Sequence, residues 1–169
     1  ETVAGDRVGL FGDPVKPGDL IVWNRGITCG RCNYCAVQRR QALCPHREVY
    51  GISLSARAPY WLNGCYAEMI YVRPGSELIV LPPDTDPAAI APATCSGATA
   101  AHAVELCDIA IGDTVLIIGP GPLGLFSAAF ALARGAADVI VSGSKPINSL
   151  QDLAEDMGCS VLLSSDTRE

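Results

Sequence analysis

The sequence predicts an α/β protein in two parts, and three observations lead to this prediction. Short apolar runs separated by proline and glycine fill about the first ninety residues, as in β-rich structure. A cluster of four cysteines lies among these runs. After residue 112 the pattern changes to apolar strands that alternate with helices, which is typical of a doubly wound parallel sheet. We therefore expect a β-rich part over residues 1–94 and a parallel-sheet part over residues 95–169.

Composition restricts the class of protein. Of 169 residues, 49% are hydrophobic and 18% are charged, which favours a packed core over disorder. The net charge of −6 and the absence of a run of Lys or Arg argue against nucleic acid or an anionic membrane as partner. The apolar stretch Val115–Ala133 begins with glycine and proline between two apolar segments, so it reads as strand, turn and helix rather than as a membrane span.

The first part is predicted to contain three strands and to lead into a helix. Pro-Gly and Pro-Pro pairs bound the apolar runs and mark turns. An alanine-rich segment, Pro87–Ala103, then predicts a tightly packed helix. The predicted strands are Leu20–Trp23, Glu68–Val72 and Leu78–Leu81.

The cysteine cluster predicts a metal site. Cys29, Cys32, Cys35 and Cys44 are separated by two, two and eight residues, so one loop can wrap its thiolates around a single ion. A closed tetrahedron of four thiolates is the geometry of structural zinc, and the tight spacing is unfavourable for disulfides between neighbours. An iron–sulfur cluster is the alternative, but its last gap is three residues rather than eight. We expect a zinc lobe over residues 24–50.

The other four cysteines are scattered among apolar or glycine-rich neighbours. They are Cys65, Cys95, Cys107 and Cys159. Scattered thiols together with one metal site fit a reducing compartment better than four disulfides would, and we therefore expect a cytoplasmic protein.

The second part is predicted to alternate strictly between strand and helix. Short links between these elements indicate parallel strands joined by right-handed crossovers. The first strand is a continuous apolar run, which predicts burial on both faces. The predicted strands are Thr114–Ile118, Asp138–Val141 and Ser160–Leu163, and the predicted helices are Leu123–Ala133 and Pro146–Met157.

A glycine-rich turn between the first strand and helix predicts a dinucleotide site. Gly119, Gly121 and Gly124 have the GxGxxG spacing, for a tight turn, close approach of a pyrophosphate, and close packing of helix on strand. The helix N-terminus that follows favours an anion. Pro122 suits the first helical turn, and Leu123 follows it at the site. The alternative is a turn that is purely structural.

The end of the second strand bears on the choice of dinucleotide. NAD-binding chains usually carry an acidic residue there, but this chain has Gly143, Ser144 and Lys145. Ser144 and Lys145 can hydrogen-bond and neutralise a 2′-phosphate, which favours NADP over NAD. The alternative for Lys145 is a solvated loop residue, as exposed lysines usually are.

Together these motifs resemble the medium-chain zinc-containing alcohol dehydrogenases over nearly the whole chain. The resemblance lies in Gly18-Asp19, the Cys-Gly-Arg-Cys-Asn-Tyr-Cys loop, Asn63-Gly64-Cys65-Tyr66-Ala67-Glu68 and the segment Gly112–Gly119. It implies a partial GroES-like β-barrel catalytic domain with a zinc lobe, followed by a partial Rossmann coenzyme domain. Trp23 and the stretch Asp13–Asp19 also resemble a subgroup associated with phosphonate-utilisation genes.

The resemblance implies roles for single residues. The four clustered cysteines match the ligands of the family's structural zinc, and Cys95 matches a ligand of its catalytic zinc. Thr99 matches a position beside the nicotinamide. The family's other catalytic-zinc ligands, a Cys and a Gly-His-Glu segment, precede the zinc lobe and do not occur before Cys29. We therefore expect a fragment that is inactive alone.

The implied function of the intact parent is hydride transfer between an alcohol or polyol and NAD(P), with the alcohol oxygen on a catalytic zinc. The resemblance also implies a homodimer or homotetramer. The alternative is a non-catalytic fragment, stapled by zinc, that binds a dinucleotide or another protein.

Overall fold

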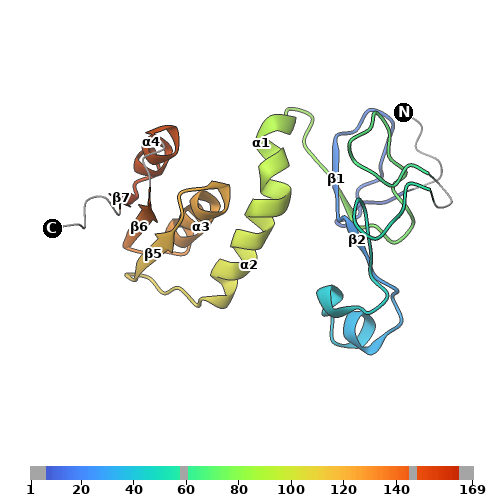
Figure 1. Cartoon of the computed structure of the whole chain (residues 1–169), viewed down its shortest axis with the longest axis horizontal. Coiled ribbons are helices and arrows are strands. Elements are labelled where there is room, and N and C mark those ends of the chain that lie inside the picture. Colours follow the sequence, from blue (N-terminus) through green and yellow to red (C-terminus); the bar gives the residue numbers. More distant parts are fainter. Residues whose placement is uncertain (1–6, 58–60, 145–147, 164–169) are drawn as a thin grey trace. The chain divides into compact units, whose positions relative to one another are not determined.

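The computed structural model describes residues 7–57, 61–144 and 148–163, and its chain divides into two compact units (Figure 1). By packing, the units are Glu1–Thr85 and Asp86–Glu169. The division between residues 94 and 95 that the sequence indicates concerns functional domains, and it stays a prediction. Each unit is described by itself below.

The first unit is built from two small antiparallel sheets. Strand β1 (Ile21–Trp23) pairs with β4 (Leu78–Val80), and Val22 lies opposite Ile79. Strand β2 (Gly26–Ile27) pairs with β3 (Glu48–Val49). The strands predicted at Leu20–Trp23 and Leu78–Leu81 are therefore confirmed, and they pair with each other.

The strand predicted at Glu68–Val72 is wrong, because this segment pairs with no neighbouring strand and is held by isolated hydrogen bonds, several of them from side chains. The Tyr50 hydroxyl donates to the Tyr71 carbonyl at 2.9 Å and accepts from the Arg73 N–H at 2.6 Å. Arg7 donates to the Val72 carbonyl at 2.6 Å. These bonds satisfy the backbone groups that a ladder would otherwise use.

The zinc lobe predicted from the cysteines lies between β2 and β3. It contains a single turn of π-helix, η1 (Asn33–Val37), and a short 3₁₀-helix, η2 (Gln41–Leu43). In Figure 1 these turns form a small body of their own beside β2.

The second unit begins with an interrupted helix where one continuous helix is predicted. Helix α1 (Pro87–Pro92) starts with its N-cap Asp86, whose carboxylate accepts from the Ala88 N–H at 2.9 Å. A π-helical turn, η3 (Ala93–Gly97), follows, and α2 (Ala98–Leu106) completes the segment. Pro92 lacks the N–H of a regular helix, and its ring disfavours the preceding turn, which explains the interruption.

A parallel sheet of three strands, in the order β5-β6-β7, forms the rest of the second unit. Its strands are β5 (Thr114–Ile118), β6 (Asp138–Gly143) and β7 (Ser160–Leu163). The crossovers are α3 (Pro122–Ala133) and α4 (Asn148–Asp156). The predicted alternation is confirmed, although Pro146, where the second helix is predicted to start, lies outside the described residues.

One core holds this sheet and its helices together. Val139 and Val141 of β6 are almost fully buried beneath Ala128 and Ala131 of α3 and Ala154 of α4. The small alanines allow the helices to approach the sheet closely. Partly buried side chains extend this core on the same face of the sheet, namely Val115, Ile117, Leu150 and Val161.

The prediction that β5 is buried on both faces is wrong for the described chain. Val115 and Ile117 face the core, but Leu116 is 58% exposed and Ile118 is 85% exposed. Both crossover helices cover the same face, so the apolar residues of the opposite face have no helix over them. An apolar run shows that a strand suits burial, but it does not show what covers it.

We predict that Gly124→Ala destabilises the second unit by about 1–3 kcal/mol, because overpacking at a fixed backbone contact costs this much. A Cβ added at Gly124 would collide with the Gly119 carbonyl oxygen, whereas one added at Gly121 meets no atom within 4 Å. Gly121→Ala is the matched control, and urea unfolding followed by circular dichroism measures both. Equal stability of the two variants would contradict this packing.

Candidate metal centre and dinucleotide turn

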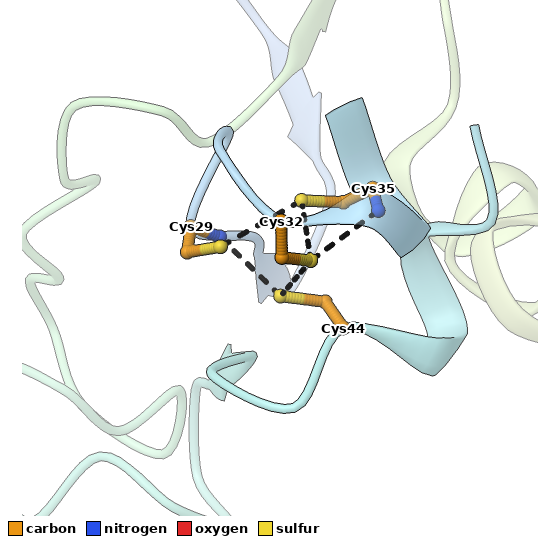
Figure 2. Close-up of side chains that lie close together, drawn as sticks. All are labelled: Cys29, Cys32, Cys35 and Cys44. Carbon is orange, nitrogen blue, oxygen red and sulfur yellow. Dashed lines mark hydrogen bonds between the residues drawn. The ribbon is translucent and has the colours of Figure 1, made fainter. Parts of the chain in front are cut away.

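The four predicted ligands converge in the structure. The Sγ atoms of Cys29, Cys32, Cys35 and Cys44 all lie within 4.8 Å of one another, and Figure 2 shows them pointing at a common centre. Cys35 and Cys44 are buried, while Cys29 and Cys32 are partly exposed. Among the described residues, this is the one group of three or more potential metal ligands. The thiols brought together are those that the sequence spacing predicts.

The distances between the sulfurs suit a tetrahedral ion. Zinc–sulfur bonds of about 2.3 Å in a tetrahedron place sulfur atoms about 3.8 Å apart. The Cys29–Cys35 distance is 3.8 Å, the Cys32–Cys44 distance is 3.9 Å and the Cys32–Cys35 distance is 3.4 Å. A soft, fourfold sulfur set at this spacing is a site for zinc or an iron–sulfur centre rather than for magnesium or calcium.

Local backbone geometry explains why the loop brings the thiols together. Gly30 has a φ of +68°, which glycine adopts at little cost, and this turn reverses the chain between Cys29 and Cys32. Cys32 then caps η1 and accepts the Cys35 N–H at 3.5 Å. The Cys29 N–H donates to the Cys44 sulfur, also at 3.5 Å. Backbone N–H groups directed at sulfur stabilise thiolates, which are the form that binds metal.

The thiols of the cluster differ in the direction in which their pKa values are shifted. Burial opposes ionisation of Cys35, but hydrogen bonds from Cys32 and the other two thiols outweigh it and lower the pKa of Cys35 to about 6. The Cys35 N–H favours the Cys32 thiolate, but burial and the thiol contacts prevail and raise the pKa of Cys32 to about 11. The Arg31 backbone lowers the pKa of Cys29. Cys35 therefore ionises more readily than Cys32, and a bound cation would displace the protons that remain on the cluster.

Arg47 packs against the base of the lobe, a contact that the sequence did not predict. Its guanidinium lies directly over Gly26, where any Cβ would collide with it. Its Nε is buried and has no hydrogen-bond partner within the part of the chain that the structure describes. The only signal in the sequence was a basic residue three positions after Cys44, which is not distinctive. Arg47 covers the strand pair at the base of the lobe.

The glycine-rich turn has the geometry expected of an anion site at a helix N-terminus. The Gly119 N–H is used in the sheet, where it donates to the Ser142 carbonyl at 2.7 Å. Pro120 and Pro122 have no N–H. The remaining donors are the N–H groups of Gly121, Leu123 and Gly124, and the first turn of a helix gives such groups no intrahelical acceptor. Gly121 has open space around its Cα, which leaves room for a close ligand.

The structure places two of the three residues predicted to select the dinucleotide. Gly143 ends β6 opposite Leu163, and Ser144 follows it and is exposed. Because β6 is parallel to β5, the carboxyl ends of both strands lie at the same edge of the sheet as the glycine-rich turn. Lys145 lies outside the described residues.

Cys95 and Thr99 lie together on the interrupted helix. Cys95 is exposed within η3, and the Thr99 hydroxyl donates to its backbone carbonyl at 2.9 Å. No cluster of metal-binding side chains surrounds Cys95 among the described residues. The chain by itself therefore presents Cys95 as a single thiol.

Comparisons with known proteins agree with these features. The chain is 30% identical over 161 residues to 5-exo-hydroxycamphor dehydrogenase of Pseudomonas putida, covering 95% of this chain and 42% of that protein. Other relatives at a similar level carry the names sorbitol dehydrogenase, L-threonine 3-dehydrogenase and alcohol dehydrogenase. No profile of a protein family matches the chain.

Solved structures share the fold. A crystal structure of an alcohol dehydrogenase from Thermotoga maritima superposes with a TM-score of 0.89 at 41% identity, over 99% of this chain and 46% of that one. A zinc-binding dehydrogenase from Sinorhizobium meliloti, solved with NADP, gives a TM-score of 0.65 at 27% identity, over 92% of this chain and 42% of that one.

These findings confirm the resemblance and the fold class. The relatives of the chain carry the names of alcohol, sorbitol and threonine dehydrogenases, and one of the solved structures is a zinc-binding dehydrogenase. The fold of the chain is a partial GroES-like unit followed by a partial Rossmann unit. The chain spans less than half the length of the relatives it matches. The resemblance to the phosphonate-associated subgroup is not supported, since the names of these relatives do not refer to it. Within the described segments, no helix is long and apolar enough to cross a membrane.

We predict that Cys35→Ser lowers the zinc affinity of the chain by at least about 100-fold, because losing a ligand costs more than losing one of its outer partners. Metal analysis after dialysis against a competing chelator measures this. The same variant should raise amide hydrogen exchange within residues 28–48 and leave the second unit unchanged. The control is Cys107→Ser, an exposed thiol outside the cluster. Retention of zinc by Cys35→Ser would contradict the four-thiolate site.

Proposed function

We propose that the chain is the structural-zinc and dinucleotide-binding portion of a zinc-dependent alcohol dehydrogenase, which transfers hydride between an alcohol or polyol and NAD(P). One observation carries the proposal: a cluster of four thiols and a glycine-rich strand–turn–helix unit occur in the same chain, which is similar over nearly its whole length to dehydrogenases. The proposed enzyme is the full-length parent, and the chain alone is proposed to be inactive.

The four-cysteine site is proposed to bind structural zinc and to take no part in the reaction. All four positions of the tetrahedron are filled by protein sulfur, so no position is left open for a substrate. Its contribution is to hold the lobe folded.

The dinucleotide is proposed to bind at the turn Gly119–Gly124. The N–H groups of Gly121, Leu123 and Gly124 would hydrogen-bond the pyrophosphate, and the α3 N-terminus favours its charge. Pro122 has a backbone φ suited to the first helical turn. The N–H that proline lacks would have no acceptor within the helix at this position. At the end of β6, Gly143 brings no carboxylate, while Ser144 and Lys145 are proposed to receive a 2′-phosphate. This arrangement favours NADP over NAD, and the relative solved with NADP supports dinucleotide binding in general.

Cys95 is proposed to be a ligand of the catalytic zinc, and Thr99 to lie beside the nicotinamide. A zinc ion held there would act as a Lewis acid on the alcohol oxygen. The π-helical turn that carries Cys95 supports this role, because such turns occur frequently at functional sites. The exposed thiol is accessible to a metal ion, and the Thr99 hydroxyl donates to the Cys95 carbonyl.

The partner and compartment follow from the same proposal. A small alcohol or polyol is the proposed substrate, nucleic acid and membranes are not proposed partners, and the full-length enzyme is proposed to be a cytoplasmic homodimer or homotetramer. The alternative, a non-catalytic fragment stapled by zinc, is not better supported by the relatives, which carry the names of dehydrogenases.

We predict that Cys95→Ser in the full-length parent removes about one zinc ion per chain and lowers kcat/KM roughly 100-fold or more. The Lewis acid supplies several kcal/mol to the transition state, and each 1.36 kcal/mol or so changes the rate about tenfold. Metal analysis and steady-state kinetics measure the two effects. Cys65→Ser, another exposed thiol, is the control. Full zinc content and activity in Cys95→Ser would refute the ligand role.

We predict that Lys145→Ala weakens NADP binding about tenfold or more and changes NAD binding little. A hydrogen bond to a charged group contributes about 1.5–3 kcal/mol, and 1.4 kcal/mol or so is a factor of ten. Fluorescence titration with each dinucleotide gives the two Kd values. Lys16→Ala, at an exposed position in the other unit, is the control. An equal loss for NAD and NADP would rule out recognition of the 2′-phosphate by this residue.

A further inference from the structure

Asn63 is a buried polar residue of the first unit that lies outside the thiol cluster and the glycine-rich turn. The residue is 2% exposed. Its Nδ2 group donates to the Ser55 carbonyl at 2.9 Å, and its backbone carbonyl accepts the Gly51 N–H at 3.1 Å. Its Oδ1 atom has no hydrogen-bond partner within the part of the chain that the structure describes. Asn63 therefore holds the loop that follows β3, but one buried acceptor stays unsatisfied, which costs stability.

Asn63 is followed by glycine, and this pair of residues is the one most prone to deamidation. The reaction begins when the backbone nitrogen of the next residue attacks the side-chain carbonyl carbon of asparagine, and glycine has no Cβ to hinder that nitrogen. The other asparagines, Asn24, Asn33 and Asn148, are followed by Arg, Tyr and Ser. A Cβ added at Gly64 meets no described atom within 4 Å, so there is space around this residue for ring closure.

The reaction is a cyclisation followed by hydrolysis. The Gly64 nitrogen bonds to Cγ of Asn63 and gives up its proton, while the Cγ–Nδ2 bond breaks and Nδ2 leaves as ammonia. Water then opens the cyclic imide at either of its carbonyl groups. The products are aspartate, or isoaspartate, in which the main chain runs through the former side chain. Water is the only co-reactant.

The folded structure opposes this reaction. Cyclisation requires the Asn63 side chain to leave the Ser55 carbonyl and turn its Cγ towards the Gly64 nitrogen, and hydrolysis requires water at a residue that is almost fully buried. The segment must therefore open locally before the reaction occurs.

The neighbourhood of Asn63 has the properties of a segment that opens more easily than the core. Leu62 and all of Cys65–Met69 are exposed. The Tyr71 N–H donates to the Leu62 carbonyl at 3.0 Å, and the Tyr50 hydroxyl in turn donates to the Tyr71 carbonyl at 2.9 Å. Segments with many exposed residues and few buried apolar contacts open at a lower free energy than the whole domain.

We propose that Asn63 is a deamidation site whose rate is set by local opening of residues 61–71, and that the product no longer fits the native structure. An aspartate in place of Asn63 has no N–H for the Ser55 carbonyl and brings a charge to a buried position where one acceptor already lacks a donor. Isoaspartate also lengthens the main chain beside the bond to Gly51. The inference does not depend on the proposed dehydrogenase function.

The test follows isoaspartate at each asparagine by peptide mapping with mass spectrometry, during incubation of the purified full chain at neutral pH. Unfolding in urea should raise the rate at Asn63 about tenfold or more, because the opening step is removed. Asn24 and Asn33 are internal controls and should form little isoaspartate in urea. Gly64→Ala should lose the product in both states and keep the urea midpoint of the wild type, since its Cβ has space.

Tyr50→Phe tests the link to opening without altering the reacting pair. It removes the hydroxyl that holds Tyr71, so the folded variant should form isoaspartate at Asn63 about tenfold faster than the folded wild type. In urea the two chains should react at the same rate. If Tyr50→Phe fails to fold, the wild type at urea concentrations below its unfolding transition replaces it, and its rate should rise with urea.

Asn63→Asp tests whether the product fits. It should lower the urea midpoint relative to the wild type, whereas the control Asn33→Asp, at an exposed position, should not. Equal rates at Asn63 in the folded and unfolded wild type would overturn the inference, and so would a folded rate that neither Tyr50→Phe nor low urea raises. An unchanged midpoint in Asn63→Asp would overturn the claim that the product is excluded from the native structure.

Discussion

The convergence of four thiols is the constraint on which the first unit depends. Between β2 and β3 the chain makes two short helical turns and buries only Cys35 and Cys44 among its side chains. Ordering each residue costs about 1–2 kcal/mol of conformational entropy, which so small a buried surface does not offset. A metal held by the four sulfurs would supply the missing free energy, since structural zinc contributes directly to folding. The loop that joins β2 to β3 is then fixed in place.

The second unit depends on the close approach of α3 to β5. Gly124 lies so near the Gly119 carbonyl that no side chain fits between them, and this contact brings α3 down onto β5. The same approach places the N-terminus of α3 at the edge of the sheet, where its N–H groups are open to an anion. Helix packing and the proposed dinucleotide binding thus use the same turn. Along α3, the alanines that cover Val139 and Val141 keep the helix at this distance.

The spacing of residues within short motifs predicted most of the features that the structure shows. The features that were not predicted depend on contacts between residues distant in sequence. The cysteine spacing and the glycine spacing each lie within one short segment, so the sequence alone indicated the thiol cluster and the turn that is proposed to bind a dinucleotide. The false strand at Glu68–Val72 arose because Arg7 and Tyr50, distant in sequence, satisfy its backbone instead of a neighbouring strand. The exposed face of β5 was missed because burial depends on which helices cover a strand. The proposed role of Cys95 came from resemblance, and the π-helical turn that carries this residue became visible only in the structure.

X-ray absorption at the zinc edge on the purified, metal-loaded chain tests the central claim most directly. The account predicts a single shell of four sulfur atoms at about 2.3 Å, from one tetrahedral ion held by the four clustered cysteines. A shell containing nitrogen or oxygen would contradict it, and so would a chain that contains iron and absorbs visible light instead of binding zinc.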